Sequence, residues 1–197
     1  MTTDPDDLTE VTALGSVVES DRGTLPFTLI HGESLVACAA WALGEAGVTV
    51  VDASVPWESV REARESFVLH DPLCPMTPAA FVAQCVRSAT ADGVVVVGVR
   101  PVTDTVKTVA DGLVGATVDR NGLVAVCSPV VLPASVCAVL EGKPRGSFAE
   151  IVTRVRQVAE VRLVEAPPEA RRVASADDVR LLEALTAPDG GVDRLPR

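Results

Sequence analysis

Short runs of valine, leucine and alanine alternate along the chain with segments in which apolar residues recur at helical spacing. Continuous apolar runs bounded by turn residues are typical of strands that a parallel sheet buries on both faces. The predicted strands are residues 11–18, 48–51, 66–69, 94–99 and 124–128. The predicted helices are residues 35–46, 56–65, 78–92, 133–141, 147–158 and 175–185.

Capping residues mark the start of three of these helices. Ser147 is followed by Glu150, and Ser175 by Asp178, so each serine hydroxyl is placed to accept from the backbone three residues on. The Thr-Pro pair at 77–78 predicts a third start, with threonine as the N-cap and proline at the first helical position.

Strands that alternate with helices predict a parallel sheet with helices on both faces, which is the α/β class. One segment departs from this order, because Asp111 and Gly112 separate two runs rich in valine and threonine. An Asp-Gly pair in that position is a hairpin signal, and it predicts an antiparallel arm at about residues 103–120. We expect one domain over residues 11–186, with flexible tails at 1–10 and 187–197.

Composition narrows the class of partner. Aromatic residues make up 3% of the 197 residues, so valine, alanine and leucine must fill the core. The net charge of −10 argues against nucleic acid or an anionic membrane as a partner. The acidic N-terminus does not resemble a signal peptide, and five cysteines lack a C-x-x-C pair. These features predict a cytoplasmic protein with no metal-ligand cluster.

Polar clusters follow three of the strand-like segments. They are His70 with Asp71, the Thr-Asp-Thr sequence at 103–105, and the Asp-Arg-Asn sequence at 119–121. Ligands of open α/β sheets bind beyond the carboxyl ends of the strands, so these clusters are the candidate site. They offer carboxylates, hydroxyls and a guanidinium suited to a phosphate.

The order and spacing of these clusters resemble a known family. Residues 101–107 read PVTDTVK, residues 117–123 read TVDRNGL, and residues 128–129 read SP. Upstream, residues 68–75 read VLHDPLCP, and downstream, residues 172–178 read RVASADD. This pattern is similar to that of the 2-C-methyl-D-erythritol 4-phosphate cytidylyltransferases, over roughly residues 66–185.

The resemblance implies a three-layer, Rossmann-like nucleotidyltransferase fold of the glycosyltransferase-A type. It also implies that CTP and a methylerythritol phosphate, a sugar-alcohol phosphate, give a cytidine-diphospho product and pyrophosphate, with Mg²⁺ as cofactor if the chain is active. Arg120 and Thr105, helped by Ser128, would bind the substrate phosphate. Asp71 would lie near the ribose and the substrate, and Arg172 near the phosphates. In such enzymes the arm completes the site of the other subunit in a homodimer.

The segment that should bind the nucleotide triphosphate departs from the family pattern. The family has a glycine-rich loop with an arginine, followed by Pro-Lys. Residues 14–27 keep part of it, namely Gly15, Arg22, Gly23 and Pro26. On this basis Gly15 and Gly23 are the candidate nucleotide-binding residues, and Arg22 and Arg172 the candidate catalytic ones. Phe27 stands in place of the lysine, however, and Glu19 and Asp21 add negative charge.

Two hypotheses follow. The first is a divergent cytidylyltransferase whose activity is weakened or lost but whose loop still holds CTP. The second is a non-catalytic, dimeric pseudoenzyme with a binding, regulatory or scaffold role. Cys74, which replaces the arginine of the family's H-D-A-A-R-P segment, is the one cysteine to consider as a reactive thiol, because it lies between prolines in a loop.

Overall fold

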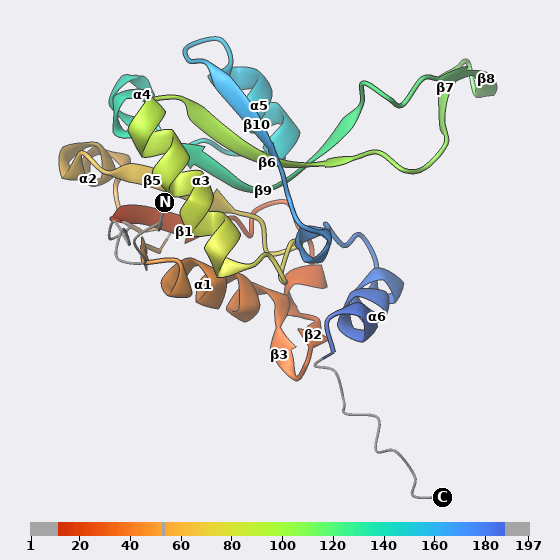
Figure 1. Ribbon diagram of the computed structural model, residues 1–197, viewed down its shortest axis with the longest axis horizontal. Coiled ribbons are helices and arrows are strands. Elements are labelled where there is room, and N and C mark those ends of the chain that lie inside the picture. Colours follow the sequence, from red (N-terminus) through yellow and green to blue (C-terminus); the bar gives the residue numbers. More distant parts are fainter. Residues whose placement is uncertain (1–11, 53, 188–197) are drawn as a thin grey trace, which may run out of the picture.

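The computed structural model describes residues 12–52 and 54–187, so the predicted tail at 1–10 and nearly all of the tail at 187–197 lie outside the described residues. A six-stranded sheet forms the centre, in the order β10-β6-β9-β5-β1-β4. Its strands are β1 (Ala13–Val17), β4 (Val48–Val50), β5 (Ser66–His70), β6 (Val95–Pro101), β9 (Val124–Leu132) and β10 (Val161–Glu165). Helices cover it on both sides (Figure 1).

The sheet is mostly parallel, as predicted, but one central strand runs the other way. β9 lies between β5 and β6 and is antiparallel to both, whereas the other neighbouring pairs are parallel. The expectation that only the arm is antiparallel was therefore wrong. The arm itself explains β9, because a chain that leaves β6 through a hairpin and returns directly must come back antiparallel to β6.

The arm is a two-stranded ribbon of β7 (Val106–Ala110) and β8 (Leu113–Val118), which extends away from the body (Figure 1). Asp111 and Gly112 have φ angles of 50° and 76°. Positive φ at both central residues is the requirement of a type I′ hairpin turn, so the Asp-Gly signal is confirmed. A second small ribbon, β2 (Leu29–Ile30) with β3 (Glu33–Ser34), follows the 3₁₀ turn η1 (Leu25–Phe27).

Six helices are formed by the described residues: α1 (Leu35–Glu45), α2 (Trp57–Ala63), α3 (Ala79–Asp92), α4 (Ala134–Val139), α5 (Phe148–Val155) and α6 (Ala176–Leu185), with a 3₁₀ turn η2 (Pro168–Ala170) before α6. The cap of α5 is the predicted capping box of Ser147 and Glu150, and Ser175 caps α6. The predicted cap of α3 was wrong. Thr77 does not cap the helix, because its hydroxyl donates to the Cys74 carbonyl instead, at 2.8 Å.

Alternation along the strands divides the core into two layers. Phe67 and Leu69 of β5 pack with α2, α4 and α5, whereas Val68 between them packs with α1 and α3. Consecutive side chains of a strand point to opposite faces, so a continuous apolar run such as SFVLH in β5 serves both layers. Valine and leucine side chains of the strands thus fill both layers of the core, and few aromatic residues are needed.

The two edge strands of the sheet are the ones that the sequence pattern did not describe correctly. β4 was expected to be buried on both faces, but it is an edge strand and its Val50 is exposed. β10, at the other edge, was not predicted at all. Its sequence VRLVE is largely exposed and lacks the apolar run of a central strand, so the pattern that marks β5 and β6 is absent from it.

Candidate functional site

A buried carboxylate lies at the centre of the candidate site. Asp71 follows the C-terminal end of β5, and its side chain is 3% exposed. The backbone N–H of Leu73 donates to its Oδ1 at 3.0 Å, and its own N–H donates to the Ser128 hydroxyl at 2.9 Å. The bond to Ser128 ties Asp71, which directly follows β5, to the neighbouring strand β9.

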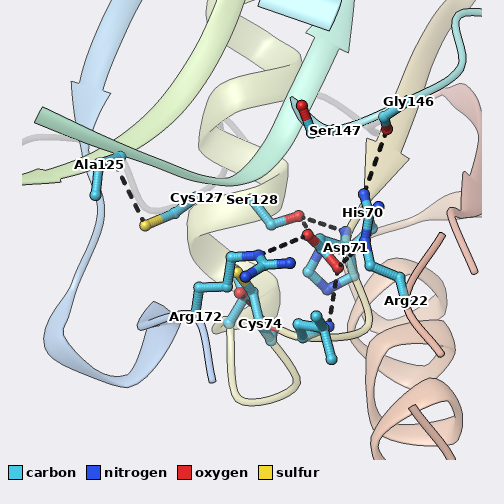
Figure 2. A network of polar contacts seen from close by, with 12 residues as sticks. Arg22, His70, Asp71, Cys74, Ala125, Cys127, Ser128, Gly146, Ser147 and Arg172 are labelled. Atoms are coloured by element: carbon cyan, nitrogen blue, oxygen red, sulfur yellow. Dashed lines mark hydrogen bonds and ion pairs between the residues drawn. The ribbon is translucent and has the colours of Figure 1, made fainter. Parts of the chain in front are cut away.

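Two arginines from distant parts of the chain neutralise this carboxylate. Arg22 Nε donates to Oδ1 and Arg172 Nε to Oδ2, each at 3.1 Å (Figure 2). The Arg22 side chain is 4% exposed, and it also donates to the Ser20 carbonyl at 3.0 Å and the Gly146 carbonyl at 3.5 Å. Arg172 is 41% exposed. The cluster is thus closed on the Arg22 side and open to solvent on the Arg172 side.

His70 supports the cluster as a neutral side chain. Its Nδ1 hydrogen-bonds the Ser128 hydroxyl, which already accepts from the Asp71 N–H. A serine hydroxyl has one hydrogen and two lone pairs, so it can either donate to Nδ1 or accept a second hydrogen bond from it. Burial lowers the pKa of His70 to about 4, against a smaller opposite effect of Asp71. Among the described residues, Nε2 has no hydrogen-bond partner.

A cleft of about 660 Å³ lies beside this cluster, at the C-terminal ends of β1 and β4. Two cations line it, Lys143 and Arg145, from the connection between α4 and α5. The same connection carries Gly146, whose carbonyl accepts from Arg22. Sequence reasoning did not single out either cation, although Lys143 is one of only two lysines in the chain.

Comparison with known proteins identifies the family. The model of the family described as 2-C-methyl-D-erythritol 4-phosphate cytidylyltransferase matches residues 48–187, well over half of the chain. The chain belongs to this family. The match begins at β4, so β1 and the altered segment at residues 14–27 lie outside it.

Among curated relatives, the 2-C-methyl-D-erythritol 4-phosphate cytidylyltransferase of Nocardia farcinica is 34% identical over 122 residues, which is 60% of this chain and 52% of that protein. The bifunctional enzyme IspD/IspF of Clavibacter michiganensis is 31% identical over 129 residues, which is 64% of this chain and 32% of that protein. The chain therefore spans about half or less of the length of these two relatives.

Solved structures share the fold. The cytidylyltransferase of Thermus thermophilus superposes with a TM-score of 0.63 at 21% identity, over 89% of this chain and 98% of that one. That of Francisella tularensis gives 0.61 at 11% identity, over 86% and 97%. The predicted Rossmann-like nucleotidyltransferase fold is thus confirmed.

The cytidylyltransferase fold brings together four of the predicted site residues: Arg22, Asp71, Ser128 and Arg172 (Figure 2). Ser128 is completely buried, and its hydroxyl is bonded to His70 and to the Asp71 N–H. Its predicted contact with the substrate would require these bonds to open. A role in holding Asp71 needs no such change.

Thr105 and Arg120 lie apart from these four residues, at the base of the arm. Both are exposed, and the Arg120 guanidinium donates to the Thr103 carbonyl. Because the arm extends away from the body, the structure of one chain does not join them to Asp71 (Figure 1). Their role as substrate-binding residues stays a prediction.

The two candidate nucleotide-binding glycines lie in different surroundings. Gly23 has a φ of 61° in the loop after β1. Gly15 lies inside β1, where a Cβ would come within 2.6 Å of Val48 and 3.0 Å of the Val68 carbonyl. Packing between β4 and β5 therefore already requires a glycine at position 15. Whether either glycine contacts a nucleotide stays a prediction.

Cys74 is not the accessible thiol that its sequence position suggested. Its side chain is fully buried. A hydrogen bond with Cys127, reinforced by burial, raises the pKa of Cys74 well above its ordinary value. A buried thiol that resists ionisation is a poor nucleophile, so the structure does not favour Cys74 as a reactive thiol.

Among the described residues, no group of three His, Cys, Asp or Glu side chains is placed to hold a metal ion. No described helix has the length and apolar character needed to cross a membrane.

Proposed function

We propose that this chain is a divergent member of the cytidylyltransferase family in which transfer from CTP to methylerythritol phosphate is weakened or lost. The observation that carries the proposal is the ion-pair cluster around Asp71. Both candidate catalytic guanidiniums, Arg22 and Arg172, donate their Nε to this one carboxylate. A triphosphate would have to compete with Asp71 for them, and Arg22 is almost inaccessible.

The surrounding charges oppose a triphosphate as well. Glu19 and Asp21 lie in the loop after β1, and Phe27 is 61% exposed where the family has a lysine. Like charges brought together at a binding site are unfavourable by several kcal/mol. Loss of a preorganised donor at a developing charge lowers the rate by about 10²–10³-fold. These effects act together on the nucleotide part of the reaction.

The direct experiment is calorimetric titration with CTP and Mg²⁺, followed by an assay for pyrophosphate release when methylerythritol phosphate is added. We expect no turnover and weak or absent binding at millimolar CTP. Turnover at a rate typical of enzymes, about 1–10³ s⁻¹, would overturn the proposal.

A gain-of-function variant tests the reason for the loss. Phe27→Lys combined with Glu19→Gln and Asp21→Asn should raise the affinity for CTP, because it restores a cation and removes two carboxylates. Val139→Lys is the matched control, since Val139 is equally exposed, at 63%, on α4. If the triple variant binds CTP no better than this control, the proposed placement of the nucleotide loop is wrong.

The alternative is a cytidylyltransferase that remains active. Family membership over residues 48–187 and the intact hairpin arm favour it. Arg172 would then have to leave Asp71 for the phosphates, which its 41% exposure permits. The pyrophosphate assay distinguishes this alternative from the non-catalytic pseudoenzyme, which would serve as a binding, regulatory or scaffold protein.

Mg²⁺, the cofactor expected of an active member, does not fit the cluster as it stands. Asp71 is its one buried carboxylate, and each of its oxygens accepts from a guanidinium. A divalent cation there would face two positive charges unless an ion pair opened. We therefore derive no step through a metal at Asp71.

We also propose that the chain forms a homodimer through its arm. Val109, Leu113 and Val114 are 67–74% exposed on the ribbon. Val109 and Val114 are paired across the two strands and share a face, and exposed apolar side chains of this kind suit burial against a second copy. Light scattering after size-exclusion chromatography should give the dimer mass for the native chain and the monomer mass for Leu113→Asp/Val114→Asp. A native monomer at micromolar concentration would refute the dimer.

A cytoplasmic location stays part of the proposal, together with the absence of nucleic-acid and membrane partners. The five cysteines without a C-x-x-C pair support a reducing compartment, and the net charge of −10, which repels polyanions and anionic lipid surfaces, supports the absence of these partners. Fractionation of cells, with the chain recovered in the cytosol, would check it.

A further inference from the structure

Two of the five cysteines, Cys74 and Cys127, lie together beside the Asp71 cluster (Figure 2). The Cys74 thiol donates a hydrogen bond to the Cys127 sulfur, so the two sulfur atoms are in contact distance. Both residues are buried, with exposed fractions of 0% and 3%. Two thiols that already form a hydrogen bond are placed to act as a pair.

The backbone holds this thiol pair in place from both sides. Cys74 ends a turn in which its N–H donates to the Asp71 carbonyl at 2.9 Å, and its own carbonyl accepts from the Thr77 hydroxyl at 2.8 Å. Cys127 lies on β9 directly before Ser128, whose hydroxyl accepts from the Asp71 N–H at 2.9 Å. Because both backbones are already ordered, a bond between the two sulfurs would cost little further conformational entropy.

The two thiols differ in how readily they ionise. The hydrogen bond from Cys74 lowers the pKa of Cys127. The Arg100 and Arg172 guanidiniums act in the same direction, whereas burial and the Asp71 carboxylate oppose them. The same hydrogen bond, together with burial, raises the pKa of Cys74. Since the thiolate is the reacting form of a cysteine, Cys127 is the nucleophile of the pair and Cys74 is its partner.

We propose that Cys74 and Cys127 form a peroxide-sensitive dithiol, which hydrogen peroxide converts to a disulfide. The Cys127 thiolate attacks one peroxide oxygen, the O–O bond breaks, and the leaving hydroxide takes up the proton that Cys127 released. The Cys74 sulfur then attacks the sulfur of the resulting sulfenic acid, and the S–O bond breaks. The hydroxide that leaves takes the Cys74 proton. Two thiols are oxidised, one peroxide is reduced, and two waters are formed.

The size of the oxidant follows from the burial of the pair. Arg172 is 41% exposed, and its guanidinium is close enough to influence the ionisation of both thiols. The open side of the Asp71 cluster is therefore the route to the sulfurs. Hydrogen peroxide is little larger than water and can pass a mobile side chain, whereas a bulky disulfide could not reach a residue that is 3% exposed.

The disulfide would join the turn that begins at Asp71 to strand β9. It would close a loop of about 50 residues, which restricts the unfolded chain and stabilises the folded one. We expect the unfolding temperature to rise by roughly 5–10 °C on oxidation. The Asp71 cluster lies at this junction, so oxidation would hold it in its closed form. This inference goes beyond the proposed function, and it holds whether or not the chain turns over CTP.

Thiol counting on the full chain tests the proposal. The reduced chain is treated with hydrogen peroxide, catalase removes the excess, and the free thiols are titrated after unfolding. We expect five thiols before treatment and, with two consumed, three after it, together with a mass lower by two hydrogens. Peptide mapping should find the cross-link between Cys74 and Cys127, and a reductant should restore all thiols. Five thiols after treatment, a cross-link between other cysteines, or an unchanged unfolding temperature of the cross-linked chain would overturn the inference.

Three variants assign the roles of the two thiols. Cys74→Ala should stop the reaction at a sulfenic acid on Cys127, which dimedone labels, because the second thiol is absent. Cys127→Ala should leave Cys74 unlabelled. Cys85→Ala is the matched control, since Cys85 is equally buried on α3, and it should still form the cross-link. Labelling of Cys74 in Cys127→Ala would show that Cys127 is not the nucleophile. The thiol count of the native chain decides the cross-link itself, even if a variant fails to fold.

Discussion

The Asp71 cluster and the neighbouring cleft both contain cationic and anionic side chains, but only those of the cluster are paired with one another. In the cluster, two guanidiniums and one carboxylate are bonded to one another and Arg22 is 4% exposed. In the cleft, Lys143 and Arg145 lie among carboxylates without forming an ion pair with them in the described residues. The number of cations near a site therefore says little about ligand binding. What matters is whether their charge is already neutralised within the protein.

The strongest test of this difference is to remove the buried carboxylate. Asp71→Asn leaves Arg22 buried without a counter-charge, and breaking a buried pair in this way costs about 3–5 kcal/mol of unfolding free energy. Urea denaturation would measure it. Asp92→Asn is the matched control, since Asp92 pairs with Arg162 at a site where both side chains are over 40% exposed, and it should cost at most about 1 kcal/mol. Equal losses would contradict the closed cluster.

The next effect concerns the pH dependence of stability through His70. Its pKa is about 4 in the folded chain and 6.5 in its ordinary state, so the unfolded chain binds more protons between these values. The stabilising contribution is complete above pH 6.5 and is lost as the pH falls toward 4, by up to about 3 kcal/mol. Unfolding free energies across this range should show the slope.

The two histidines of the chain provide the comparison for that slope. His70→Asn should remove its part of the slope, because the titrating group is gone. His31→Asn should keep it, since His31 is exposed and lies outside the cluster. A slope that persists unchanged in His70→Asn would show that other groups cause it.

A smaller effect is expected at the open side of the cluster. Arg172→Gln should cost about 1 kcal/mol or less of unfolding free energy, since Arg172 is 41% exposed and Arg22 still neutralises Asp71. Urea denaturation beside Asp71→Asn gives the ratio of the two losses. A loss as large as that of Asp71→Asn would mean that both arginines are equally essential to the closed cluster.

The smallest effect should come from the cleft. Lys143→Met should cost about 0.5–1 kcal/mol of unfolding free energy, because the half-buried stem is kept and only the contact of the ammonium with the Phe67 ring is lost. Thermal unfolding would measure it, beside the ligand titrations. A destabilisation of several kcal/mol would show that Lys143 is structural, as the cluster is, and would end the distinction between the two regions.

Much of the fold could be predicted because local patterns and tertiary contacts agree. The run at 94–99 became a central strand, the Asp-Gly pair became the turn of the arm, and Ser147 with Glu150 became a capping box. The predictions failed for strands whose burial depends on how many neighbouring strands they have in the sheet. β4 and β10 are edge strands, and no pattern inside VTV or VRLVE states how many neighbours a strand will have.

Part of the candidate site could also be predicted, because it depends on position along the chain. Residues that follow strands, such as Asp71, could be placed at the binding edge of the sheet from their position alone. That Arg22 would be directed at Asp71, 49 positions away, could not. The sequence also could not predict that Lys143 and Arg145 lie near β1 and β4, because the connection that carries them has no strand or motif of its own.

The sequence by itself determined the elements, the arm and the family resemblance, since periodicity, turn chemistry and motif spacing are properties of short stretches of chain. Only the tertiary structure decided which charges are neutralised inside the protein and which remain open to a ligand. The physical reason is that the interaction of two charges depends on their separation in space and on their burial, and the fold sets both.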